Sequence, residues 1–213
     1  MLQQIREKHP HVINIAVFVI LHTVGIIGLS SQWKALFVQL TPVNLMICAV
    51  LIWNKHQNWK SQQMLILLLC FLDGYVVEVL GVHSGVIFGE YSYGEGFGPK
   101  LFSVPPLIGL NWALLIYASA TLVNRFLQNY WLRVVLSAIL MTALDFLIEP
   151  VAIQVGFWTW EGGNIPLQNF AAWFVISLLL QSLWQRVYHE GANRSAIGFF
   201  WVQVAFFGLL GLL

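Results

Sequence analysis

The 213-residue chain is 59% hydrophobic and only 9% charged, and its formal net charge is +1. A soluble globular domain carries far more charge, so this composition excludes one and indicates an integral membrane protein. The small net charge, without any block of like charges, also excludes a nucleic-acid-binding surface. We therefore expect the lipid bilayer to surround most of the chain.

Seven apolar runs are long enough to cross a bilayer as helices, which takes roughly 20 residues each. They predict an all-α, polytopic bundle of about seven transmembrane helices, with residues 1–213 forming a single integral membrane domain. No small-residue cleavage pattern follows the first run, so we expect a retained helix and not a signal peptide. The predicted spans are residues 11–30, 35–53, 63–82, 104–123, 131–149, 168–187 and 196–213.

The basic residues predict the orientation of this multi-pass protein in the cell membrane. Eight of the ten Lys and Arg residues fall in connections on one side of the predicted topology. Because these residues accumulate in cytoplasmic loops, we expect a cytoplasmic N-terminus and a non-cytoplasmic C-terminus. The eight are Arg6, Lys8, Lys55, Lys60, Arg125, Arg133, Arg186 and Arg194, whereas Lys34 and Lys100 fall on the other side.

Two segments contain the same features in the same order, which predicts a parallel internal repeat with units at about 63–123 and 131–187. Each has an Asp, a Glu, a Gly, two aromatic residues one position apart, a Pro, an Asn and a Trp. Such a repeat would bring its four acids into one half of the bundle. The matching sets are Asp73, Glu78, Gly89, Tyr91, Tyr93, Pro106, Asn111 and Trp112, and Asp145, Glu149, Gly156, Trp158, Trp160, Pro166, Asn169 and Trp173.

The four acids of the repeat are unusual because the basic residues within the predicted spans, Arg133 and Arg186, lie at the cytoplasmic ends of those spans and not beside the acids. Only His22 and His83 are available as cationic partners inside the membrane. A carboxylate without a cation is costly there, and burial favours the protonated acid, which can act as a general acid. The alternative is that these acids only form hydrogen bonds between helices.

The spacing of the acids suggests their individual roles. Asp145 and Glu149 are four residues apart and share a helix face, whereas Asp73 and Glu78 are offset by about 140°. Pro150 is expected to interrupt the helix and free backbone carbonyls that bind a water close to Glu149. We predict that Asp145 is the general acid and that Glu149 and Glu78 hold or activate the attacking water. Asp73 is predicted to tune the acidity of Asp145 by like-charge proximity.

Aromatic and amide side chains close to the acids are candidates for substrate binding. Their spacing suits a pocket that holds a flat polyene or shields a carbocation, and the alternative is an aromatic belt at the membrane surface. The two asparagines are candidates to anchor a water or an acid, and the alternative is a helix-start or packing role. The predicted substrate-binding residues are Tyr91, Tyr93, Trp112, Trp158, Trp160, Asn111 and Asn169.

Several other chemistries are excluded by missing motifs. The last span has no lysine for a retinal Schiff base, and the chain has no GxGxxG, P-loop or HExxH sequence. His9 and His11 alone are too few for a metal site. We therefore expect no metal and no cofactor, and a proton-driven reaction on an apolar substrate.

The chain resembles the membrane carotenoid biosynthesis protein family, which contains the carotenoid 1′,2′-hydratases and bisanhydrobacterioruberin hydratase. The resemblance covers about residues 70–175. It rests on Asp73 with the following EVLGVHSGVIFGEYSY and VPPLIGLNW, and on LDFLIEPVAIQVGFWTW followed by IPLQNFAAW.

This resemblance implies an acyclic carotenoid substrate and the addition of water across its terminal double bond, the reaction of a hydro-lyase. It also implies other enzymes of the carotenoid pathway as partners. A carbocation captured within the same molecule would instead give a ring, so a lycopene-type cyclase is one alternative. A proton-coupled carrier of a small apolar molecule is the alternative from another class.

Overall fold

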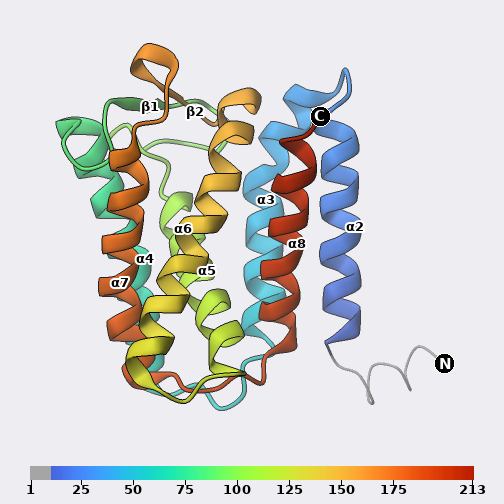
Figure 1. Ribbon diagram of the computed structural model, residues 1–213. Helices are drawn as coiled ribbons and strands as arrows, with labels where there is room; N and C mark the ends of the chain where they lie inside the picture. Colours follow the sequence, from blue (N-terminus) through green and yellow to red (C-terminus); the bar gives the residue numbers. More distant parts are fainter. Residues whose placement is uncertain (1–10) are drawn as a thin grey trace.

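The computed structural model describes residues 11–213, and this part of the chain forms seven α-helices and one small sheet (Figure 1). The all-α prediction is confirmed. Strands β1 (Tyr91–Tyr93) and β2 (Trp158–Trp160) pair at one end of the bundle, and the 3-10 helix η1 (Glu161–Gly163) follows. The helices are α2 (Val12–Leu29), α3 (Lys34–Trp53), α4 (Ser61–Ser84), α5 (Leu107–Asn124), α6 (Tyr130–Val155), α7 (Leu167–Val187) and α8 (Arg194–Leu210).

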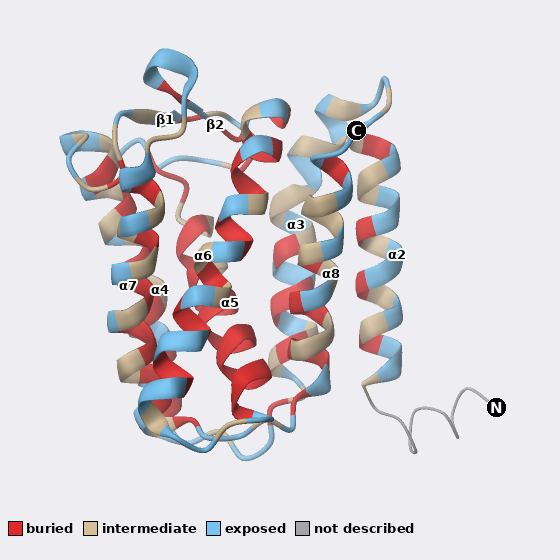
Figure 2. Ribbon diagram, viewed as in Figure 1, coloured by how far each residue is buried: buried red, intermediate tan, exposed pale blue. Residues whose placement is uncertain are grey.

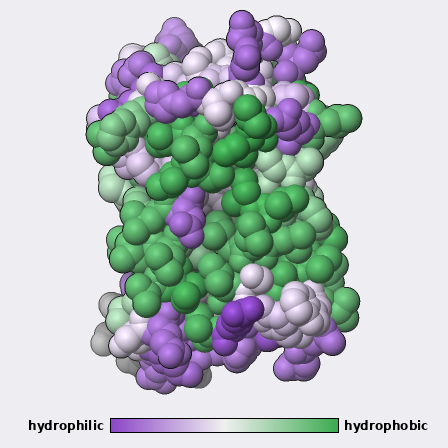
Figure 3. Space-filling view, turned by 90° about the vertical axis from the view of Figure 1, so that its left-hand side faces the viewer, coloured by the Kyte–Doolittle hydropathy of each residue, from purple (hydrophilic) through white to green (hydrophobic). Residues whose placement is uncertain are grey.

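The outer surface of the bundle is built to face lipid. Among the described residues, six helices are long and apolar enough to cross a membrane, and α8 is an apolar helix of 17 residues. At 1.5 Å per residue α8 is about 26 Å long, close to the thickness of a bilayer's hydrocarbon core. Figure 3 shows a broad hydrophobic belt between hydrophilic ends. The prediction of a polytopic membrane bundle is therefore confirmed.

Helix α5 is the central element, and nearly all of it is buried (Figure 2). It begins beside the middle of α4, where a Cβ on Gly109 would lie 2.5 Å from the Phe71 carbonyl oxygen. The segment before it, residues 94–106, folds back along α4, and the Tyr75 hydroxyl donates to the Leu101 carbonyl at 2.6 Å. The start of α5 therefore lies deep inside the bundle.

Helix α6 continues through Pro150, so the predicted interruption of the helix at this residue is wrong. Proline has no N–H, and the Phe146 carbonyl loses its usual helical partner there. The turn beyond the proline is held by packing, since Val151 and Val155 are buried against the bundle. Gly156 then ends the helix in a left-handed conformation with φ of 80°, and the chain turns into β2.

The two strands are antiparallel, with Tyr91 opposite Trp160 and Tyr93 opposite Trp158. Side chains alternate along a strand and opposite residues share a face, so all four aromatic side chains lie on one face of the sheet. The other face is exposed and carries Ser92, whose hydroxyl bonds that of Thr159 at 3.2 Å. The aromatic face is therefore the one that covers the bundle.

Polar contacts tie the helices together at the end opposite the sheet. His56, in the connection before α4, bonds the Tyr117 hydroxyl at 2.8 Å and Gln63 at 3.2 Å. Asn193, at the start of α8, donates to the same hydroxyl at 3.0 Å. This network holds α4, α5 and α8 in fixed positions relative to one another.

The close approach of α4 and α5 depends on Gly74, where an added Cβ would lie 2.5 Å from the Trp112 Cβ. We expect Gly74→Ala to destabilise the protein by about 1–3 kcal/mol, the usual cost of overpacking a well-packed core. Thermal unfolding of the purified protein in detergent measures this. Gly208→Ala in α8 is the matched control, because a Cβ there meets no atom within 4 Å. Equal stability of the two variants would contradict this account of the α4–α5 contact.

Candidate active site

A small cavity lies between the aromatic face of the sheet and helices α4, α5, α6 and α7. Its volume is about 20 Å³. About 10–15 Å³ is enough for one water, so the cavity has room for a water but not for an organic substrate. Its lining combines three acids with aromatic and amide side chains: Glu78, Phe88, Tyr91, Tyr93, Ile108, Asn111, Asp145, Ile148, Glu149, Trp158, Trp160, Asn169 and Trp173.

Glu78 of α4 is buried and accepts three hydrogen bonds. Its Oε2 accepts from the Tyr91 hydroxyl at 2.5 Å and the Tyr93 hydroxyl at 2.8 Å. Its Oε1 accepts from Trp112 Nε1 at 3.0 Å. Burial, together with the neighbouring Glu78 carboxylate, raises the pKa of both tyrosines above the usual range, so their hydroxyls stay protonated and donate.

Glu149 of α6 has matching surroundings. Its Oε2 accepts from Trp158 Nε1 at 2.9 Å and from Trp160 Nε1 at 2.8 Å, and its Oε1 accepts from Asn169 Nδ2 at 3.2 Å. In both sites a helix supplies the acid and the strand after that helix supplies two aromatic donors. The corresponding features of the two predicted repeat units therefore meet in the structure, while the duplication itself stays a prediction.

Asp145 lies one turn before Glu149 on the same face of α6 and is only 1% exposed. Its Oδ2 accepts from Asn169 Nδ2 at 3.1 Å, and this is its one side-chain hydrogen bond within residues 11–213. The same amide nitrogen also reaches Glu149. Asn169 of α7 therefore links the two acids of α6, and Asp145 receives fewer donors than either glutamate.

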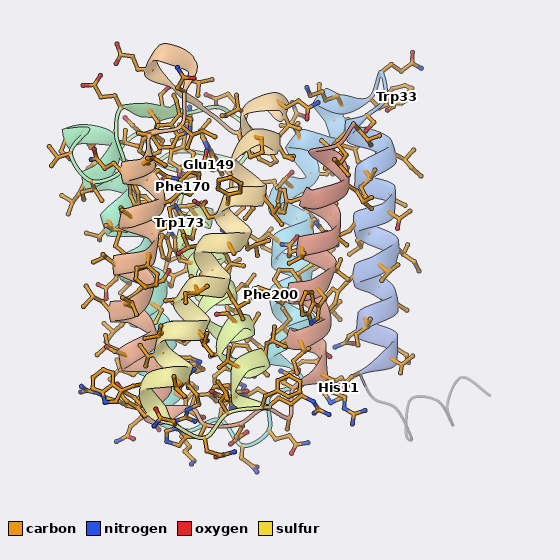
Figure 4. The ribbon with its side chains drawn as sticks, viewed as in Figure 1. His11, Trp33, Glu149, Phe170, Trp173 and Phe200 are labelled. Carbon is orange, nitrogen blue, oxygen red and sulfur yellow. The ribbon has the colours of Figure 1, made fainter. Side chains whose placement is uncertain are left out.

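Two stacked tryptophans pack beside the acids, deeper in the bundle than the sheet. The rings of Trp112 from α5 and Trp173 from α7 lie with centroids 4.0 Å apart and an interplanar angle of 13°. Asn111, next to Trp112, also lines the cavity and makes no side-chain hydrogen bond within residues 11–213. Figure 4 shows Trp173 and Glu149 in the half of the bundle closer to the sheet.

Asp73 does not join the other three acids. It lies on the exposed side of α4, whereas Gly74, four residues before Glu78, is the residue that packs against Trp112. The five-residue spacing turns Asp73 away from Glu78 by about 140° on a regular helix. The predicted proximity of Asp73 to Asp145 is therefore wrong.

Neither histidine that was available as a cation contacts the cluster. His22 bonds the Phe18 carbonyl at 2.8 Å and Gln203 at 3.1 Å, which ties α2 to α8. His83 bonds the Phe102 carbonyl at 3.2 Å. Within residues 11–213 the one ion pair joins Lys100 to Glu95 outside the cavity. The three buried acids therefore rely on neutral donors.

Four cavity residues were not among the predicted site residues. Trp173 and Ile148 had a signal in the sequence, because Trp173 matches Trp112 in the repeat and Ile148 lies one turn after Asp145. Ile108 and Phe88 had none. Phe88 reaches the cavity because the chain reverses after α4 at Gly85, whose φ is 65°, and packs the ring against Gly81.

The fold and the cavity define a helical, polytopic membrane protein with a buried cluster of acids and aromatic donors. The family model described as carotenoid biosynthesis protein matches residues 34–212, and the chain belongs to this family. The resemblance seen in the sequence is thereby confirmed.

One curated relative is the bisanhydrobacterioruberin hydratase of Haloarcula japonica. It is 30% identical over an alignment of 116 residues, and the match covers 49% of this chain and 38% of that protein. The match thus covers less than two thirds of the relative's length. No solved structure matches the chain.

Proposed function

We propose that this protein is a carotenoid hydratase that adds water across the terminal double bond of an acyclic end group. The observation that carries the proposal is a set of three buried acids that have no cationic partner within residues 11–213 and that line a cavity for about one water. Membership of the carotenoid biosynthesis family and a relative named as a hydratase support it. Hydration of an unactivated alkene needs a buried acid and one positioned water, and this site has buried acids and a cavity with room for one water.

Asp145 is the proposed general acid. Hydrogen bonds to a carboxylate favour its charged form, and each glutamate receives three, whereas Asp145 receives one. Among the three acids, a proton is therefore held best on Asp145. Its depth in the bundle also keeps bulk water away from the carbocation.

The reaction then runs as three proton transfers and one addition of water. The Asp145 proton adds to the less substituted alkene carbon, forming a C–H bond and leaving a tertiary carbocation. The oxygen of the cavity water attacks that carbon and forms the C–O bond, while one of its protons passes to Glu149 or Glu78. Transfer of this proton to Asp145 restores the acid, so no oxidant, reductant or cofactor is consumed.

The aromatic lining is suited to the carbocation. The ring centroids of Tyr91 and Trp160 are 5.0 Å apart, and those of Tyr93 and Trp158 are 5.9 Å apart. A cation within about 6 Å of such rings is attracted to their faces. Asn111 also lines the cavity, and its amide, which makes no side-chain hydrogen bond within residues 11–213, is placed to orient the water.

Expression in a host that accumulates lycopene tests the reaction directly. We expect a pigment heavier than lycopene by one water, because the carbocation is captured by the bound water. Mass spectrometry of the extracted pigments identifies it. An isomer of unchanged mass would indicate a cyclase, and unchanged lycopene would contradict hydration and favour the carrier or another substrate.

Asp145→Asn tests the assignment of the acid. The variant keeps the size and polarity of the side chain but cannot give up a proton, so turnover should fall by about two to four orders of magnitude. Asp73→Asn is the matched control, since this acid lies outside the cavity, and it should turn over at the wild-type rate. The reverse result, with protein levels in the membrane unchanged, would place the proton donor on α4.

We also propose that the sheet and the cavity lie on the non-cytoplasmic side. The opposite end of the bundle, in its connections and helix ends, carries Lys55, Lys60, Arg125, Arg133, Arg186 and Arg194, which favours a cytoplasmic position for that end. A reporter active only outside the cytoplasm should give signal when fused to the C-terminus and none when fused after Arg125. The opposite pattern would reverse the orientation.

A further inference from the structure

The cavity is too small for the end of a carotenoid, so part of its wall must move before substrate reaches Asp145. We propose that the end group of the carotenoid enters sideways from the bilayer between α6 and α7, an inference that rests on the proposed hydratase function. The portal is closed by the rings of Phe146 and Phe170. The occupant is the terminal isoprenoid unit of an acyclic polyene, with the rest of the chain in a groove outside.

This groove, called here the α6–α7 groove, lies on the outer side of the contact between the two helices. Its volume is about 510 Å³. From residue 139 to residue 146 it follows α6 for about 10 Å, at 1.5 Å per residue. Its lining is almost entirely apolar, as a hydrocarbon chain requires: Ile139, Thr142, Ala143, Phe146, Phe170 and Phe174.

The groove ends directly outside the proposed acid. Asp145 and Asn169 are hydrogen-bonded across the two helices, and Phe146 and Phe170 are the next residues on α6 and α7. The two rings pack against each other with centroids 5.1 Å apart. A path from the lipid inward therefore passes first the groove, then the Phe146–Phe170 pair, and then the hydrogen-bonded pair of Asp145 and Asn169. Figure 4 shows Phe170 in the same half of the bundle as Glu149 and Trp173.

The phenylalanine pair lies outside the residues that line the cavity, and one of its two rings faces lipid. Phe146 is 63% exposed, so lipid replaces its contacts when the ring turns. Its carbonyl also lacks a helical donor because Pro150 has no N–H, and helices bend most readily at such positions. Both features favour opening of the bundle at this point.

The other grooves suit a polyene end less well. An apolar groove of about 540 Å³ lies between α3, α4 and α5, but α5 packs tightly against α4 there, at Gly74 and Gly109. That contact leaves no path to the acids. The groove at the sheet end is lined by His83, Glu90 and Glu161 among others, which suits water and not hydrocarbon.

Filling the α6–α7 groove tests the portal. Ala143→Trp places a large ring in the groove at an exposed, lipid-facing position that does not touch the acids. We expect turnover of lycopene to fall by about 10²-fold, as when a substrate is displaced from its reactive position. Ala143→Ser leaves the groove open and should retain activity. Leu68→Trp, which fills the groove between α3, α4 and α5, should also retain activity.

Pigment retention provides a second measurement that does not need turnover. Purified Asp145→Asn protein from a lycopene-containing host should carry bound lycopene, and adding Ala143→Trp should remove it, while adding Leu68→Trp should not. If the wild type makes no hydrated product but this pattern of retention holds, the hydratase function fails and the portal stands. Thermal unfolding checks that each variant is folded.

Three results would overturn the portal. One is that Ala143→Trp turns over lycopene at the wild-type rate and that the Asp145→Asn protein still retains lycopene when Ala143→Trp is added. Another is that Leu68→Trp abolishes turnover and lycopene retention whereas Ala143→Trp does not, which would assign the route to the groove between α3, α4 and α5. The third is absence of both turnover and retained pigment in protein without substitutions in either groove, because the portal would then have no polyene ligand.

Discussion

The structure depends on one constraint, which is that a carboxylate buried in a membrane without a cation must be satisfied by hydrogen bonds. Glu78 and Glu149 each receive two of their three donors from the strand that follows their own helix. The pairing of β1 with β2 aims all four aromatic side chains at the acids. The sheet, although only three residues long in each strand, therefore determines the polar interior of the bundle.

The central helix provides the remaining walls of the site. Because α5 starts beside the middle of α4, Asn111 and Trp112 reach the level of the acids and not the surface of the membrane. This position requires glycine where the two helices touch. It also stacks Trp112 on Trp173, and Trp173 lines the cavity.

The cavity borders two solvents of opposite character. Tyr91 and Trp160 line both the cavity and the polar groove at the sheet end, so one wall separates the acids from water. The phenylalanine pair between α6 and α7 separates them from lipid. Addition of water to a polyene joins a polar reactant to one that dissolves in hydrocarbon, and a site between the two solvents fits that reaction.

The sequence by itself determined the helical membrane fold, because only internally hydrogen-bonded segments cross a bilayer and apolar runs reveal them. It also determined that Asp145 and Glu149 share a face, since a four-residue spacing fixes this within one helix. Tertiary structure decided the rest. Packing of Gly74 against α5 set the rotation of α4 that leaves Asp73 outside, and buried contacts carried α6 past Pro150. Strand pairing between residues far apart in the chain then assembled the donors, and local sequence patterns carry no record of such contacts.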